Sequence, residues 1–116
     1  MAHRLAGSSL FLLDRKKLWM SAGADWLRLG DRWVDTYRLR TIKVTTGVGT
    51  YHLELTDSAG NKLDTQVYYL QKNRALWDLV YNGILHSITY NHADVNRRAV
   101  NHLHLQAVIR NPPTGR

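Results

Sequence analysis

Histidine is the residue with the widest chemical repertoire in this chain, and six histidines are present. His102 and His104 stand two residues apart, so they would share one side of a strand but lie on opposite sides of a helix. A zinc site needs three or four converging ligands at characteristic spacings. The chain has no cysteine and no His-Glu-x-x-His pattern. We therefore expect surface or capping histidines and no bound metal.

Carboxylates and serines offer the next route to catalysis. Most of the nine acidic residues fall in predicted turns or on outward strand faces, so no pair of them is predicted to share an apolar cleft. Ser58 lies in a predicted hairpin turn rather than in a strand–turn–helix elbow. The glycines of Thr46–Thr50 lack the Lys-Ser/Thr of a phosphate loop. The residues favour a binding protein over an enzyme and predict no cofactor.

The net charge of +7 raises the question of an anionic partner. Residues 1–43 carry nine Lys/Arg and four Asp, residues 44–90 three Lys/Arg and four Asp/Glu, and residues 91–116 four Arg and one Asp. Basic ends around a near-neutral middle are compatible with binding to nucleic acid or an acidic membrane surface.

One predicted strand region could form a basic sheet face with interleaved aromatics, a pattern that can hold phosphates and stack bases. Its candidate anion-binding residues are Arg28, Arg32, Arg38, Arg40 and Lys43. The alternative is a solvated strand face whose cations pair with Glu54 and Asp64 across the sheet. Acidic residues interrupt the same stretch, and charges beyond about 8 Å are screened at physiological salt. We therefore expect no strong nucleic-acid binding. Arg97 and Arg98 are interpreted as a solvated helix face.

Tryptophan and tyrosine are unusually frequent, with four and six copies against one phenylalanine. Both side chains combine a large apolar body with a polar end, which suits protein interfaces. The candidate interface aromatics are Trp19, Trp26, Trp33 and Tyr68. Packing in the core is the competing role for such residues, and Trp77 is the best core candidate.

Short strands are predicted for the first two thirds of the chain. Ser9–Leu13 is a first strand candidate, and the three tryptophans that follow recur every seven residues with glycines between them. Interior glycines argue against a helix and favour successive strand–turn units. Residues 51–56 alternate, residues 57–61 form a turn, and a return strand continues through Val67 and Tyr69.

The apolar period changes to helical after Leu70. A helix is predicted over residues 73–87, capped by Asn73, with Leu76, Leu79, Val80 and Ile84 on one face. Ser87–Tyr90 is predicted as a short strand or link. A further helical segment from Asn91 is expected to bury Ala99 and Leu103, and the pattern at its end fits either a helix or a strand. Residues 1–110 are expected to form one domain and residues 111–116 a flexible tail.

These elements predict an α+β fold, with a small antiparallel β-sheet or partly open barrel capped by an amphipathic helix and followed by a C-terminal helical segment. The stretches Trp26–Trp33 and Tyr37–Val44 resemble the hydrophobic hairpin and following strand of small bacterial pleckstrin-homology-like domains. The resemblance covers Leu18 to about His86, and the segment from Asn91 is additional to it. The turns that bind lipid headgroups in such domains are acidic here.

A non-catalytic binding or scaffold module is the function that these observations favour. It would act by protein–protein contact, with a homo-oligomer as one form of that contact. The alternative is a binder of anionic ligands, nucleic acid or an acidic membrane, through the basic sheet face. No apolar run reaches the roughly 20 residues needed to span a bilayer, and the absence of cysteine fits a cytoplasmic protein.

Overall fold

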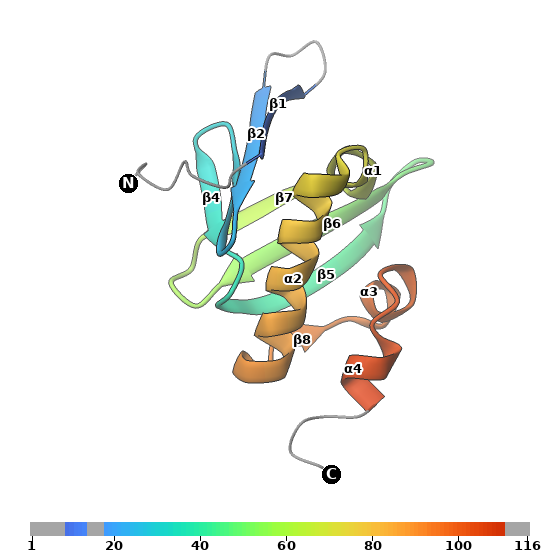
Figure 1. Ribbon diagram of the computed structural model, residues 1–116. Coiled ribbons are helices and arrows are strands. Elements are labelled where there is room, and N and C mark those ends of the chain that lie inside the picture. Colours follow the sequence, from blue (N-terminus) through green and yellow to red (C-terminus); the bar gives the residue numbers. More distant parts are fainter. Residues whose placement is uncertain (1–8, 14–17, 111–116) are drawn as a thin grey trace.

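Two β-sheets and four helices make up the computed structural model, which describes residues 9–13 and 18–110, with side chains for residues 20–109 (Figure 1). The first sheet contains strands β1 (Ser9–Leu13), β2 (Leu18–Gly23), β3 (Trp26–Leu29) and β4 (Arg32–Asp35) in sequence order. The second contains β5 (Leu39–Thr46), β6 (Tyr51–Asp57), β7 (Lys62–Gln66) and β8 (Asp94–Val95), in the order β7-β6-β5-β8. The helices are α1 (Val67–Gln71), α2 (Arg74–Asn91), α3 (Arg97–His102) and α4 (Gln106–Arg110).

The α+β fold is as the sequence predicted, and the two sheets do not join into a closed barrel within the described residues. The first sheet is an antiparallel meander in which each tryptophan of the repeat lies in a separate strand, so the strand–turn interpretation is confirmed. Side chains alternate between the faces of a strand. Accordingly, Ala22, Leu27 and Val34 form one fully buried row across β2, β3 and β4.

The second sheet contains the predicted hairpin, in which Leu53 and Leu55 of β6 point into the core. Its return strand is shorter than predicted, because Val67 and Tyr69 lie in helix α1. Gln66 pairs with His52 near the start of β6, so the chain beyond it has little strand left to pair with. Val67 and Leu70, three residues apart, instead bury one side of a short helix.

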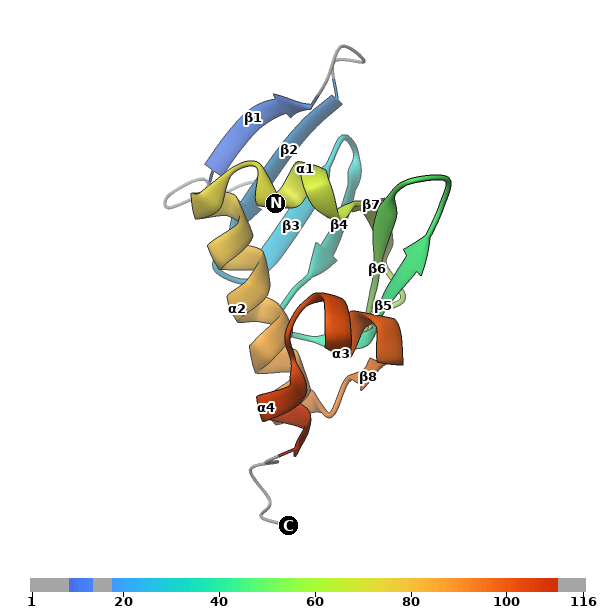
Figure 2. The same cartoon turned by 90° about the vertical axis from the view of Figure 1, so that its right-hand side faces the viewer.

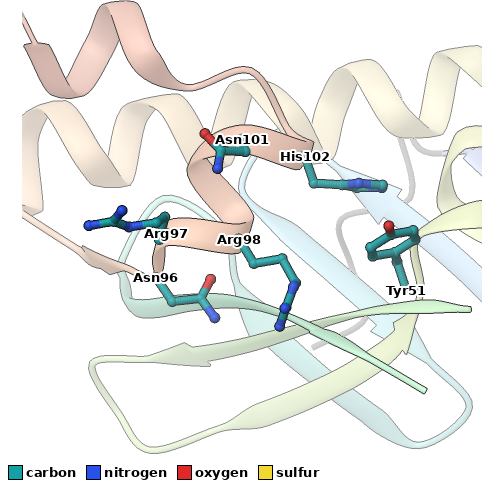
Figure 3. A pocket seen from close by; sticks show the side chains of 6 residues that line it. All are labelled: Tyr51, Asn96, Arg97, Arg98, Asn101 and His102. Carbon is teal, nitrogen blue, oxygen red and sulfur yellow. The ribbon is translucent and has the colours of Figure 1, made fainter.

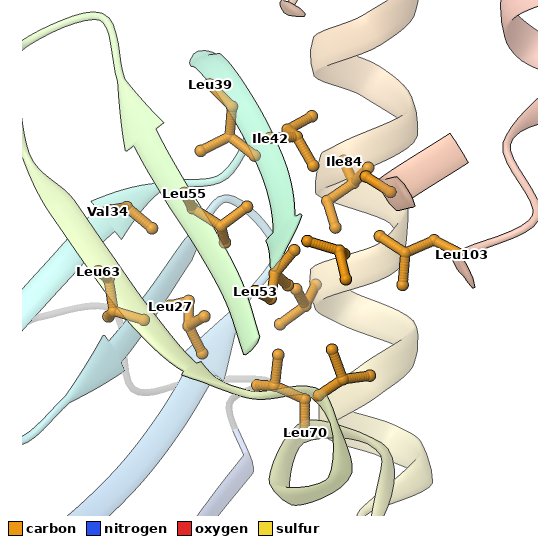
Figure 4. Close-up of a cluster of buried hydrophobic side chains, with 14 of the residues drawn as sticks. Leu27, Val34, Leu39, Ile42, Leu53, Leu55, Leu63, Leu70, Ile84 and Leu103 are labelled. Atoms are coloured by element: carbon orange, nitrogen blue, oxygen red, sulfur yellow. The ribbon is translucent and has the colours of Figure 1, made fainter. Parts of the chain in front are cut away.

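Helix α2 covers both sheets and closes the core (Figures 2 and 4). Asn73 caps it as predicted, with its side-chain oxygen accepting from the Leu76 backbone N–H at 3.0 Å. The predicted end at residue 87 is wrong. The helix continues to Asn91 because Ile88 extends the apolar face, and it ends where His92 takes a left-handed conformation with φ 55°.

Trp77 is only partly buried, contrary to its prediction as the best core residue. The fully buried apolar side chains of α2 are those of Leu76, Val80 and Ile84, and Trp77 lies at the edge of that stripe. Its ring packs against that of Tyr81 with centroids 5.5 Å apart. Leu79 is likewise only partly buried.

The chain after Asn91 adds one short strand and two short helices. Strand β8, which contains Val95, pairs parallel with β5. Ala99 in α3 and Leu103 after it are buried as expected. The segment around His104 is a turn with φ 58°, neither helix nor strand. The predicted tail, residues 111–116, lies outside the described residues. Among the residues that the structure describes, no helix is long and apolar enough to cross a membrane.

Candidate functional site

The outward face of the first sheet carries Trp26, Arg28 and Trp33, which we call the tryptophan face. Trp26 and Arg28 are two residues apart in β3, so they share a face, and Arg28 pairs directly with Trp33 of β4. The row behind them, with Leu27 and Val34, points into the core. Trp33 is 48% exposed, which is high for so large an apolar side chain. The fold therefore presents an aromatic and a cation side by side to solvent.

Gly23 helps to set the position of Trp26. A Cβ atom at this position would overlap the Trp26 indole, so the ring lies directly over the glycine backbone of strand β2. The indole is thereby half-buried and ordered by its own sheet. Trp19, another predicted interface residue, lies in β2, but its side chain is outside the described ones.

Tyr68 does not belong to the tryptophan face. It lies in α1, is 64% exposed, and packs at 5.7 Å against the ring of Tyr69. The ammonium group of Lys72 stands 5.5 Å from the Tyr68 ring centroid. The predicted interface aromatics are thus divided between two places, with Trp26 and Trp33 together and Tyr68 apart.

The five predicted anion-binding residues do not share one sheet face. Arg28 and Arg32 belong to the first sheet, Arg38 lies in the connection between the sheets, and Arg40 and Lys43 belong to β5. All five are exposed.

Three of these five cations have polar or acidic neighbours. The Arg28 Nε donates to the Gly30 carbonyl oxygen at 2.8 Å, and the Arg38 Nε lies 4.0 Å from the Asp35 carboxylate. Lys43 stands opposite Glu54 in the strand register, whereas Asp64 stands opposite Glu54 and not opposite a cation. The structure therefore disperses this charge over two sheets and their connection.

A groove that the sequence did not reveal lies between the start of β6 and helix α3 (Figure 3). We call it the arginine–tyrosine groove. Its volume is about 530 Å³, and the residues that line it are Tyr51, Asn96, Arg97, Arg98, Asn101 and His102. The Tyr51 and His102 rings stack with centroids 4.1 Å apart and planes 28° from parallel. Tyr51 remains 45% exposed.

Asn96 holds helix α3 in place beside this groove. Its side-chain amide donates to the Val44 carbonyl oxygen at 3.0 Å and accepts from the Val44 N–H at 3.0 Å, as a neighbouring strand would. The same side-chain oxygen accepts from the Ala99 N–H at 2.9 Å and so caps the helix. Arg97 and Arg98 follow directly, in the first turn of the capped helix.

A second hollow of about 290 Å³ adjoins the first and shares its Tyr51–His102 pair. The other residues that line it are Gly49, Thr50, Gln66, Val67, Tyr68 and Gln71. No residue lining either hollow is acidic. Two features of the sequence point to this site. One is Asn96, a helix cap placed directly before Arg97 and Arg98. The other is Tyr51, the aromatic at the start of the alternating row that continues with Leu53 and Leu55.

Histidines and carboxylates do not gather into a metal site within the described residues. His102 and His104 are separated by the end of α3, and His104 is exposed. His86 stacks at 4.1 Å on the ring of Tyr37.

Comparison of the chain with protein-family models, with curated proteins and with solved structures yields no significant match.

Proposed function

We propose that this chain is a non-catalytic binding module that docks a protein partner on the tryptophan face. The observation that carries the proposal is the exposure of Trp33, 48%, directly beside Arg28 and on the same face as Trp26. Tryptophan and arginine are the residues most enriched among those that dominate protein-binding energy. Tryptophan in addition covers a large contact area with only two rotatable side-chain bonds, so binding costs it little conformational entropy.

Charge around this face favours a protein partner over a polyanion. Arg28 is accompanied by Asp35, which lies across the strand pair from Trp26, and by Asp31 in the adjoining turn. A surface with both signs of charge suits the mixed chemistry of another protein. No observation favours the alternative basic sheet face, because its five cations are dispersed over the fold.

A second copy of this chain is the first partner to test, because symmetric homodimers are the commonest protein assemblies. We further propose that the module works in the cytoplasm, since it contains no cysteine. The pleckstrin-homology-like assignment also stays a proposal. Its support is the order of four antiparallel strands, three more strands and a long helix.

The test compares four full-length proteins, namely the wild type, Trp33→Ala, Arg28→Ala and the control Tyr90→Ala. Tyr90 is 69% exposed on α2, away from the tryptophan face. Sedimentation velocity over a range of concentrations measures self-association, and quantitative mass spectrometry measures which proteins each immobilised variant retains.

We expect both face variants to weaken one specific association by about tenfold or more, and the Tyr90 control to leave it unchanged. Associations that are the same in all four proteins would disprove the proposal.

A further inference from the structure

We propose that the arginine–tyrosine groove binds a nucleoside phosphate, with the phosphate on Arg98 and Arg97 and the base stacked on Tyr51. This site lies on the second sheet and shares no residue with the tryptophan face. The proposal therefore stands independently of the proposed function.

Two arginines supply the phosphate-binding chemistry. Both are exposed in the first turn of α3, and in Figure 3 the Arg98 side chain extends between Asn96 and Tyr51 while that of Arg97 points away from Tyr51. A guanidinium group presents several N–H donors in a plane that matches two phosphate oxygens. Arg98 is therefore the direct ligand, and Arg97 adds positive charge at the rim.

No acidic residue lines the groove that contains these arginines. Tyr51 and Leu53 face the helices, so Glu54, one position further along β6, points to the opposite face of the sheet. Asp94 of β8 is the nearest acidic residue in sequence, and it does not line the groove. A phosphate in the groove would thus meet donors and no carboxylate.

The aromatic pair supplies the surface for a base. His102 covers part of Tyr51 at a centroid distance of 4.1 Å and so fixes its ring, yet Tyr51 is still 45% exposed. A planar base can extend this stack, and such stacking tolerates any base because each has a π-face. Asn101, on the same helix, offers an amide that can donate or accept beside the ribose or base.

The dimensions suit one nucleotide. A volume of about 530 Å³ falls within the range of about 300–1,000 Å³ typical of small-molecule sites. The groove is open, so its ligand can be a free nucleotide or one nucleotide of a single strand. In the second case the adjoining hollow beyond the Tyr51–His102 pair takes the neighbouring nucleotide.

The full chain is titrated separately with adenosine 5′-monophosphate, adenosine and ribose 5-phosphate. Calorimetry and amide NMR shifts measure the affinity for each ligand. We expect the nucleotide to bind at least about tenfold more tightly than either fragment, because only the nucleotide uses both the arginines and the ring. Arg98→Ala and Tyr51→Leu should each weaken binding by about tenfold. The control Arg40→Ala, an exposed arginine of β5, should leave it unchanged.

A single-stranded oligoadenylate distinguishes the two sources of the nucleotide. With two phosphates contacted, raising the salt from about 50 to about 200 mM should weaken its binding about sevenfold. Binding of the oligonucleotide alone, lost in Arg98→Ala, would identify nucleic acid as the source. Binding of the mononucleotide alone, lost in the same variant, would identify a free nucleotide.

Four outcomes would overturn the proposal. They are no binding of either nucleotide form, equal binding of ribose 5-phosphate and the nucleotide, equal loss in Arg40→Ala and Arg98→Ala, or no loss in Arg98→Ala. Arg98 is exposed, so its variant should fold. Circular dichroism of each variant checks this directly.

Discussion

The side chain of Asp57 accepts four hydrogen bonds although it is only 1% exposed. The donors are the backbone N–H groups of Asp35, Ala59 and Asn61 and the side-chain amide of Asn61, at 2.9–3.0 Å. The first of these bonds ties the β6–β7 turn to strand β4 of the other sheet. A single carboxylate therefore joins the two sheets at one end of the molecule.

Replacement of this carboxylate should be costly. We expect Asp57→Ala to lower the free energy of unfolding by roughly 3 kcal/mol, because it leaves several part-buried N–H groups without acceptors. Urea denaturation followed by tryptophan fluorescence measures the change. Asp64→Ala is the control, since Asp64 is exposed on β7 and pairs across the strands with another acid, Glu54. Equal stability of the two variants would contradict this role for Asp57.

Tyr81 anchors the C-terminal helices, because its hydroxyl donates to the Leu103 carbonyl oxygen at 2.8 Å. Burial raises the pKa of Tyr81 above its ordinary value of 10.0. In the unfolded chain the hydroxyl loses its proton at a lower pH than in the folded chain. The stabilisation from this shift is therefore complete below pH 10 and is lost as the pH rises through the folded-state pKa.

The pH dependence can be isolated with Tyr81→Phe. We expect the wild type to be about 1 kcal/mol more stable than this variant at neutral pH, because of the hydrogen bond. The difference should shrink between about pH 9 and about pH 11. Denaturation at several pH values measures it, and a difference that stays constant across this range would count against the assignment.

At the scale of elements, helix α2 is fastened to the connection between the sheets. The Ser87 hydroxyl donates to the Thr36 carbonyl oxygen at 2.7 Å and accepts from the Leu39 N–H at 2.9 Å. Gly83, one turn earlier, lies directly over Thr36, and a Cβ atom there would stand 2.5 Å from the threonine Cβ. The helix can approach this closely only because residue 83 has no side chain.

Gly83→Ala tests this close approach. Alanine is the better helix former by about 1 kcal/mol, yet we expect the variant to lose about 1–3 kcal/mol because the helix must move away from Thr36. The neighbouring change Asn82→Ala, on the exposed side of α2, should be neutral or slightly stabilising. Thermal unfolding of the pair measures the difference, and a Gly83→Ala protein as stable as Asn82→Ala would refute the packing argument.

Local patterns predicted most elements, because strand alternation, the Asp57 turn and the Asn73 cap act within a few residues. The errors arose where contacts between residues far apart in the sequence decide where an element ends. Strand β7 ends at Gln66 because β6 offers little strand to pair with beyond it. Helix α2 passes residue 87 because Ile88 extends its apolar face, and the Ser87 hydroxyl finds an acceptor in the distant Thr36 carbonyl oxygen.

The candidate sites show the same division. The shared face of Trp26 and Trp33 follows from strand alternation once the turn between them is recognised. The arginine–tyrosine groove does not follow from strand alternation. Tyr51 and His102 are brought together only when β8 pairs with β5 and Asn96 sets the direction of α3. Neither contact leaves a periodic pattern in the sequence.

For the whole molecule, the distribution of charge matters more than its total. A net charge of +7 would favour duplex nucleic acid if it lay along one face, but the exposed arginines are spread over both sheets, the connection between them, α2 and α3. We expect no sub-micromolar binding to a duplex oligonucleotide at about 150 mM salt, because tight binders make about six to ten phosphate contacts. Fluorescence anisotropy measures this, and tight binding that Arg38→Ala and Arg40→Ala weaken together would restore the basic sheet face.

The pairing of β8 and Asn96 with strand β5 has a consequence for how the protein behaves in concentrated solution. These residues satisfy the backbone groups of Ile42 and Val44 on the outer edge of the second sheet. A chain cut before Asp94 would present that edge, with its buried isoleucine and valine, to any other copy. Bare edges of this kind pair with one another and lead to aggregation. Strand β8 and Asn96 thus cover the outer edge of β5 and protect it from pairing with another copy of the chain.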